Sequence, residues 1–234
     1  MCSLSCATFV VRTLRPSEVT GRTVLEVGSR GDGLRPIIES WGPREYIGVD
    51  IRPGRNVDRV LSVYDLESTF NDKKFDIVIS SEVIEHLRDW KLAIQNMKSV
   101  CRESGSLLLT TRSPGYRPHG APNDHWRFTT DDLRVVLSDF SKVNVENDYL
   151  YPGVFALGRG YASNHPVELG PIAIYSMHTG TRRQEVSKWD RVRPRSIGTL
   201  VSSLVLDSLE YGVVNGPGRW LRYHDDNSGS PPAT

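Results

Sequence analysis

Carboxylates and glycines stand at the ends of two predicted strands. The segment 23–27 (TVLEV) is a short apolar strand that contains Glu26, and glycines follow at positions 28, 31 and 33. A second apolar segment, 46–50, ends on Asp50, 22 positions after Gly28. Glycines let a ligand approach the backbone closely, and an acid at the end of the second strand can accept hydrogen bonds from both hydroxyls of a ribose. The spacing therefore predicts a site for a ligand that carries an adenosine.

Two ligand classes fit a strand, a glycine turn and a later acid: the dinucleotides and S-adenosylmethionine. The glycines follow the spacing G-x-x-G-x-G, which differs from the dinucleotide fingerprint G-x-G-x-x-G. Glu26 separates the two classes further, because a carboxylate repels a diphosphate but attracts the ammonium and sulfonium groups of S-adenosylmethionine. The turn is therefore predicted to bind S-adenosylmethionine.

Strand-like and helix-like patterns alternate around these residues. The predicted strands are 23–27, 46–50, 59–66, 75–81 and 105–111, followed by a pair at 142–150 and 153–160. The predicted helices are 34–41, 82–101 and 130–140. Such alternation predicts a doubly wound α/β fold whose mostly parallel sheet is covered on both faces. Ligands bind such sheets at the carboxyl ends of the strands, and the candidate residues fall there.

Length, charge and cysteine content exclude several classes of protein. The chain has 234 residues and a net charge of +1, which argues against nucleic-acid binding by bulk electrostatics. Cys2, Cys6 and Cys101 are too few for a disulfide framework and indicate a reducing compartment. The start of the chain lacks a signal-peptide pattern, and no apolar run reaches the roughly 18 residues of a membrane helix. We therefore expect a cytoplasmic protein without a membrane span.

Taken together, several motifs resemble one enzyme family. VLEVGSRGDGLRP, YIGVDIRPG, YDL, FDIVISSEVIEHL and GSLLLTT resemble the class I S-adenosylmethionine-dependent methyltransferases, most closely the small-molecule type with E-H-L after the fourth strand. The resemblance spans positions 22–140 and implies a Rossmann-like sheet of seven strands. One departure is that Arg30 and Asp32 stand where the family spacing E-x-G-x-G-x-G has its later glycines.

The resemblance implies roles for residues at the strand ends. Glu26 is expected to meet the methionine ammonium, directly or through water. Asp50 is expected to bind both ribose hydroxyls while Ile51 packs on the adenine. Asp65 would accept a hydrogen bond from the adenine amino group, and Leu66 would lie against the ring. The backbone of six further residues is expected to lie near the cofactor: Gly28, Ser29, Gly31, Gly33, Ser80 and Ser81.

Histidines after the fourth and fifth strands are the candidates for chemistry at the methyl acceptor. Methyl transfer from a sulfonium needs mainly alignment, and a base is required only if the acceptor loses a proton. Histidine has a pKa suited to that task, so His86 and His125 are the predicted catalytic residues. The loop 112–129 also supplies the predicted acceptor-binding residues: His119, Asp124, Trp126 and Arg127.

Structural explanations compete with these roles. His86 can simply pack at the start of the helix 82–101, and a buried Trp126 with an Arg127 salt bridge can anchor a rigid loop. A metal held by His119, Asp124 and His125 matches no established spacing. Cys2 and Cys6 make only half a zinc site, so no metal is predicted.

The domain organisation follows from these patterns. We predict an N-terminal segment (1–22), a cofactor-binding methyltransferase domain (23–160), a C-terminal extension (161–223) and a disordered tail (224–234). The extension contains an amphipathic helix, 197–214, with one apolar face formed by Ile197, Leu200, Val201, Leu204, Ser208 and Tyr211. That face must be buried, by default on the catalytic domain and otherwise in a homodimer. Acidic residues on its polar face disfavour a membrane surface.

Three functions remain open from the sequence. The leading one is methylation of an oxygen or nitrogen atom of a small-molecule or glycan-type acceptor. The second is methylation of RNA or protein, supported only by the basic run 181–195. The third is a non-catalytic subunit that keeps the cofactor fold.

Overall fold

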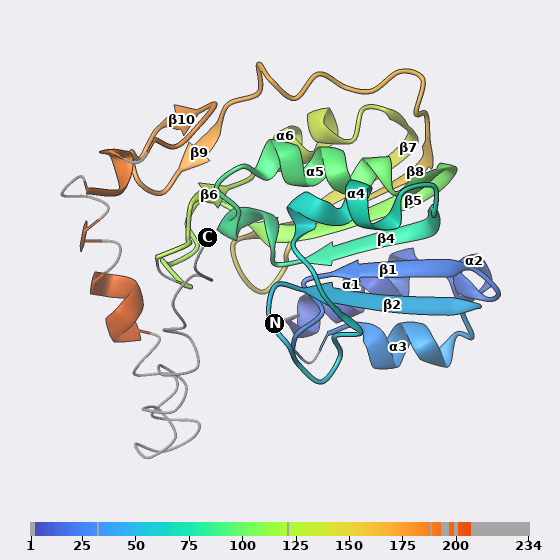
Figure 1. Cartoon of the computed structure of the whole chain (residues 1–234). Coiled ribbons are helices and arrows are strands. Elements are labelled where there is room, and N and C mark those ends of the chain that lie inside the picture. Colours follow the sequence, from blue (N-terminus) through green and yellow to red (C-terminus); the bar gives the residue numbers. More distant parts are fainter. Residues whose placement is uncertain are drawn as a thin grey trace, which may run out of the picture.

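A seven-stranded sheet forms the centre of the protein (Figure 1). The computed structural model describes residues 3–31, 33–120, 122–187, 189–192, 197–198 and 201–206. The strands are β1 (Thr23–Val27), β2 (Glu45–Asp50), β3 (Arg59–Val60), β4 (Phe75–Ser81), β5 (Cys101–Arg112), β7 (Phe140–Asn147) and β8 (Gly153–Tyr161). Their order is β3-β2-β1-β4-β5-β8-β7, and only β8 runs antiparallel to its neighbours. This confirms the predicted, mostly parallel α/β fold.

Two predicted elements are shorter than expected. The third strand covers only Arg59–Val60, because the Ser62 hydroxyl accepts from the Tyr64 amide and starts the 3-10 turn η1 (Val63–Asp65). The helix predicted at 82–101 is also wrong in its first part. Glu82 has a left-handed backbone with φ 57°, and the E-H-L motif begins in the 3-10 turn η2 (Ile84–His86). The α-helix α5 starts only at Trp90, where the Asp89 side chain caps it.

Helices cover both faces of the sheet, because strand residues alternate between two apolar cores (Figure 1). In β1, Leu25 packs into one core and Val24 into the other. The first core lies under α4 (Leu66–Phe70), α5 (Trp90–Ser99) and α6 (Thr130–Val136). The second lies under α1 (Leu4–Thr13), α2 (Pro16–Val19) and α3 (Arg35–Ser40).

The N-terminal helix α1 is part of the domain core. Cys6, Phe9 and Val10 are buried in the second core, and the Phe9 ring lies 5.3 Å from the Phe155 ring of β8. The segment predicted to precede the domain therefore packs directly on its sheet.

The glycine turn after β1 is held by the buried carboxylate of Glu26. One oxygen accepts from the Leu34 amide at 3.3 Å, and the other accepts from the Tyr46 hydroxyl of β2. A side chain at Gly33 would place its Cβ 2.8 Å from Glu26 Oε1, so a glycine is needed there. Glu26 therefore connects the turn, the start of α3 and β2.

A second, three-stranded sheet joins the C-terminal extension to the loop 113–129. It consists of β6 (Trp126–Arg127), β9 (Ile174–Ser176) and β10 (Arg182–Arg183) in the order β10-β9-β6. The strands pair antiparallel, with Trp126 opposite Ser176. Residues 174–183 therefore brace the segment that the sequence places over the acceptor.

The C-terminal helix is described only at 197–198 and 201–206; the rest of the predicted 197–214, and the tail after it, lie outside the described residues. Ile197, Val201 and Leu204, all expected on a buried face, are 42–54% exposed. Ser203, which is not part of that face, is completely buried. For the described part, the expected packing of the apolar face on the catalytic domain is therefore wrong. No helix in the described ranges is long and apolar enough to cross a membrane.

Loss of the Phe9 side chain is expected to destabilise the whole domain. Phe9→Ala should lower the free energy of unfolding by about 3–5 kcal/mol, because it leaves a cavity between α1 and β8. Val11→Ala, at a position 54% exposed on the same helix, is the matched control and should change little. Denaturant unfolding measures both variants, and equal stabilities would show that α1 contributes nothing to the core.

Glu26 is expected to make stability depend on pH. Burial raises the pKa of Glu26 above its ordinary 4.5, although the hydrogen bonds from Tyr46 and Leu34 offset part of that effect. The folded state therefore holds a proton that the unfolded state releases, so this contribution is most favourable below pH 4.5 and is lost as pH rises through the raised pKa. Glu26→Gln keeps the shape without the ionisation, so its melting temperature relative to wild type should increase from pH 4.5 to pH 8.

The matched control is Glu103→Gln, because Glu103 is exposed on β5. Its difference from wild type should stay constant over the same pH range. A constant difference for Glu26→Gln as well would contradict a raised pKa at this position.

Candidate active site

The ends of β1 and β2 form the predicted cofactor side. Val27 lies opposite Val49, so Gly28 and Asp50 leave the sheet at the same level. Gly28 has φ 85°, and an added Cβ would lie 2.2 Å from a methyl carbon of Val83, so no other residue fits there.

Asp50 and Ile51, both predicted to bind the cofactor, follow each other at the end of β2. One oxygen of the half-buried Asp50 accepts from the Arg52 amide at 3.0 Å, and no donor among the described residues reaches the other. Ile51 is 67% exposed beside it. A carboxylate oxygen and an uncovered apolar side chain therefore lie together, as a ribose and an adenine ring require.

Other predicted cofactor residues lie in different surroundings. Leu66 is completely buried in the first core, so its side chain offers no surface to an adenine ring, and this expectation is corrected. Asp65, which precedes it, is exposed. Ser29 is buried, with its hydroxyl directed to the Val49 carbonyl at 3.4 Å, while Gly31 is exposed and Gly33 half-buried. Glu26 has its internal partners Tyr46 and Leu34 and no exposed surface.

The end of β4 carries an unpaired buried hydroxyl. Ser80 lies opposite Val27 of β1, and its Oγ is buried without a hydrogen-bond partner among the described residues. Ser81 is 5% exposed at the last position of the strand. Three features fit a cofactor with a ribose and a polar tail. The glycine turn allows close approach to the backbone, Asp50 can accept hydrogen bonds from hydroxyls, and Ser80 has an unsatisfied polar atom.

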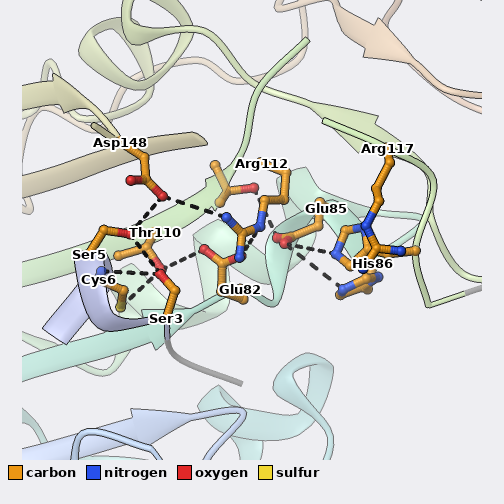
Figure 2. Close-up of polar contacts among 12 residues, drawn as sticks. Ser3, Ser5, Cys6, Glu82, Glu85, His86, Thr110, Arg112, Arg117 and Asp148 are labelled. Carbon is orange, nitrogen blue, oxygen red and sulfur yellow. Dashed lines mark hydrogen bonds and ion pairs between the residues drawn. The ribbon is translucent and has the colours of Figure 1, made fainter. Parts of the chain in front are cut away.

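Glu82 begins a buried network that the sequence did not reveal. Its Oε1 accepts from the Thr110 hydroxyl at 3.1 Å, and its Oε2 pairs with the Arg112 guanidinium. Arg112 also lies 3.7 Å from Asp148, which accepts from the Ser5 hydroxyl at 2.9 Å (Figure 2). This network therefore connects helix α1 to the ends of strands β4, β5 and β7.

The electrostatics of this network favour a protonated carboxyl. Burial, with the negative charge of Glu85, raises the pKa of Glu82 to about 8, although Arg112 acts in the opposite direction. Glu82 also has a left-handed backbone, and such strain in a residue with a side chain often marks a functional site.

Glu85 lies at the centre of the predicted acceptor side. Its carboxylate is completely buried, and Oε2 accepts from the Thr111 hydroxyl of β5 at 2.9 Å. The other oxygen lies 3.9 Å from Nε2 of His86 and 3.8 Å from Nε2 of His119. Figure 2 shows the Glu85 and His86 side chains directed toward each other.

His86 keeps a lone pair available near neutral pH. Burial lowers the pKa of the imidazole, and the negative charge of Glu85 offsets part of that effect. Nδ1 lies 2.9 Å from the Asn123 carbonyl, which can only accept, so Nδ1 carries the hydrogen and Nε2 does not.

Asp124 and Arg127 form a buried, two-pronged ion pair. The guanidinium donates to both oxygens of Asp124, at 2.5 and 2.7 Å. Burial pushes the pKa of Asp124 upward, but Arg127 and His119 outweigh it and hold the pKa well below its usual range. Arg127 is completely buried, so the expected contact with an acidic acceptor is corrected to a structural role.

Trp126 and His125 are structural in the same way. Trp126 is completely buried, and its indole donates to the Leu87 carbonyl at 2.9 Å, so it does not stack on an acceptor. His125 is 2% exposed, and its Nδ1 lies 2.7 Å from Nε2 of His178. Its placement therefore argues against direct contact with an acceptor, and only His86 of the two predicted catalytic histidines faces Glu85.

A family model described as a methyltransferase domain matches residues 4–141. None of the curated proteins matches the sequence. Among solved structures, an S-adenosylmethionine-dependent methyltransferase from Archaeoglobus fulgidus has a TM-score of 0.54 at 16% identity, over 65% of this chain and 92% of that one.

Two other structures share the fold. The CurJ carbon methyltransferase has a TM-score of 0.51 at 17% identity, over 68% of this chain and 56% of that one. The N-methyltransferase NodS from Bradyrhizobium japonicum WM9, in complex with S-adenosyl-L-homocysteine, has a TM-score of 0.50 at 13% identity, over 68% of this chain and 88% of that one. The family match, the strand order and the residues at the strand ends agree: this chain belongs to the methyltransferase-domain family and is an S-adenosylmethionine-dependent methyltransferase.

Proposed function

We propose that the enzyme methylates an oxygen or nitrogen atom of a small-molecule or glycan-type acceptor, bound beside Glu85, His86 and His119. The observation that carries the proposal is the set of buried ionisable groups at the ends of β4 and β5, next to the glycine turn. Perturbed pKa values in such a place are typical of a reacting centre.

The cofactor supplies a methyl group on a sulfonium, whose carbon–sulfur bond breaks with its electron pair on sulfur as an acceptor lone pair bonds to the carbon. Asp50, Ile51 and the backbone at Gly28 hold the cofactor in this proposal. His86 takes the proton that a hydroxyl acceptor loses, because its Nε2 carries a lone pair at neutral pH. Trp126 and the Asp124–Arg127 pair anchor the loop on this side.

Charge disfavours RNA as the acceptor. With Glu82 protonated and no cation bound, the groups named at the site are three carboxylates (Glu85, Asp124 and Asp148) and two guanidiniums, and this negative balance repels a polyanion. Within the basic run 181–195, Arg182 pairs with Asp132 and is not available for phosphate. A neutral or cationic acceptor therefore fits better.

Asp50→Ala is expected to weaken binding of S-adenosyl-L-homocysteine by about 1–3 kcal/mol, because ribose hydroxyls lose a charged hydrogen-bond acceptor. Titration calorimetry measures the affinity. Asp72→Ala, at an exposed acid after α4, is the matched control and should bind like wild type. Unchanged affinity in Asp50→Ala would remove Asp50 from the cofactor site.

Methyl-labelled cofactor tests the class of acceptor. Incubation with separated small-molecule, RNA and protein fractions of a cell extract should place the label in the small-molecule fraction. His86→Ala should reduce that transfer by about 10²–10⁴-fold while affinity for S-adenosyl-L-homocysteine stays near wild type. His165→Ala, at an exposed histidine, is the control that should retain full transfer. Label found only in RNA or protein would overturn the proposal.

A further inference from the structure

The strongest unexplained feature is the gap between Glu85, His86 and His119. The facing ligand atoms are Oε1 of Glu85 and Nε2 of each histidine, and all three lie within 4.8 Å of one another. The oxygen–nitrogen distances of 3.9 and 3.8 Å are too long for hydrogen bonds. The three side chains therefore form a potential metal-ligand set of two histidine nitrogens and one carboxylate oxygen.

The carboxylate oxygen in this gap lacks a donor. Glu85 is completely buried, and Oε1 has no hydrogen-bond partner among the described residues. Its other oxygen is fixed by Thr111 at 2.9 Å, so the side chain cannot turn away without losing that bond. A buried carboxylate oxygen is costly without a partner, so a positive group is expected to face it.

The histidines are oriented as metal ligands usually are. The Asn123 carbonyl holds the hydrogen of His86 on Nδ1, which leaves a lone pair on Nε2, directed at the gap. Nδ1 of His119 lies 3.6 Å from Asp124 Oδ1, and the His119 amide donates to the same carboxylate at 3.0 Å. The Asp124 carboxylate beside His119 favours the hydrogen on Nδ1 of that ring as well, and two lone-pair nitrogens facing a carboxylate oxygen would be stabilised by a cation or a shared proton between them.

We propose that Glu85, His86 and His119 bind one divalent first-row transition metal ion such as Zn²⁺. Imidazole nitrogens favour such ions over Mg²⁺ or Ca²⁺. Around a tetrahedral ion with bonds of about 2.0–2.2 Å, ligand atoms lie roughly 3.3–3.6 Å apart, so the two oxygen–nitrogen distances of 3.9 and 3.8 Å must each shorten by about half an ångström. Three protein ligands leave a position open, as catalytic sites do.

The open position gives the site a use in methyl transfer, and in this respect the inference rests on the proposed function. An acceptor oxygen held there would lose its proton to water more readily, since a cation favours the deprotonated form. With the ion bound, Nε2 of His86 would be a ligand, so the proton-accepting role proposed above for His86 would belong to the metal-free enzyme.

Metal binding by the full chain tests the inference directly. After removal of metals with a chelator, titration with Zn²⁺ by calorimetry and with Co²⁺ by visible absorption should give one ion per chain. His119→Ala and His119→Gln should bind at least about tenfold more weakly, while His165→Ala should bind like wild type. Circular dichroism and affinity for S-adenosyl-L-homocysteine confirm that each variant is folded, and His119→Gln serves if the alanine variant is not.

Two results would overturn the metal site. One is a wild-type protein that binds neither ion, which leaves a shared proton between Glu85 and the histidines. The other is equal affinity in wild type and His119→Gln. Metal-free protein that labels small molecules at the full rate would remove the catalytic use of the ion but leave the proposed function intact. Metal binding together with label found only in RNA would overturn the proposed function but leave the metal site intact.

Discussion

Burial of the Glu85 carboxylate is the constraint on which the acceptor side depends. A negative charge without exposure to water needs partners from several directions, and each comes from a different element. Thr111 of β5 donates to one oxygen, His86 and His119 face the other, and the Glu85 carbonyl accepts from the His125 amide at 2.9 Å. Strand β5, the turn η2 and the loop 113–129 are therefore fixed relative to one another by one side chain and its own backbone.

The backbone of the predicted cofactor side, which is the glycine turn and the two strand ends, could be predicted from the sequence because its signals are local. An apolar strand, a glycine that must adopt a positive φ and an acid at the next strand end all lie within about 30 residues, and each follows from backbone geometry. The alternation of strands and helices likewise predicts the parallel sheet, and β4 lies where the pattern puts it. Errors occurred where a side chain overrode the pattern, as with the Ser62 and Asp89 caps.

The acceptor side could not be predicted in the same way, because its partners are distant in the chain. His125 looks like a free base in a polar loop, but His178 lies against it from 53 positions away. Glu82 and Arg112 look like ordinary strand-end charges, yet Asp148 and Ser5 complete their network. Spacing within a loop cannot distinguish a residue that contacts an acceptor from one that anchors the loop. The signal that was available is Arg112 itself, a charge directly after a buried strand.

Glu26 shows how one carboxylate can satisfy the fold and the ligand together. Its charge at the mouth of the glycine turn led to the choice of a cationic cofactor, while its hydrogen bonds go to Leu34 and Tyr46. These bonds set the path of the turn, so the acid shapes the backbone that a cofactor would approach. Burial raises the pKa of Glu26 and so disfavours its charged form, which means that its influence on the turn is exerted mainly through these hydrogen bonds. A buried acid at this position therefore shapes the predicted ligand site through the turn that it holds.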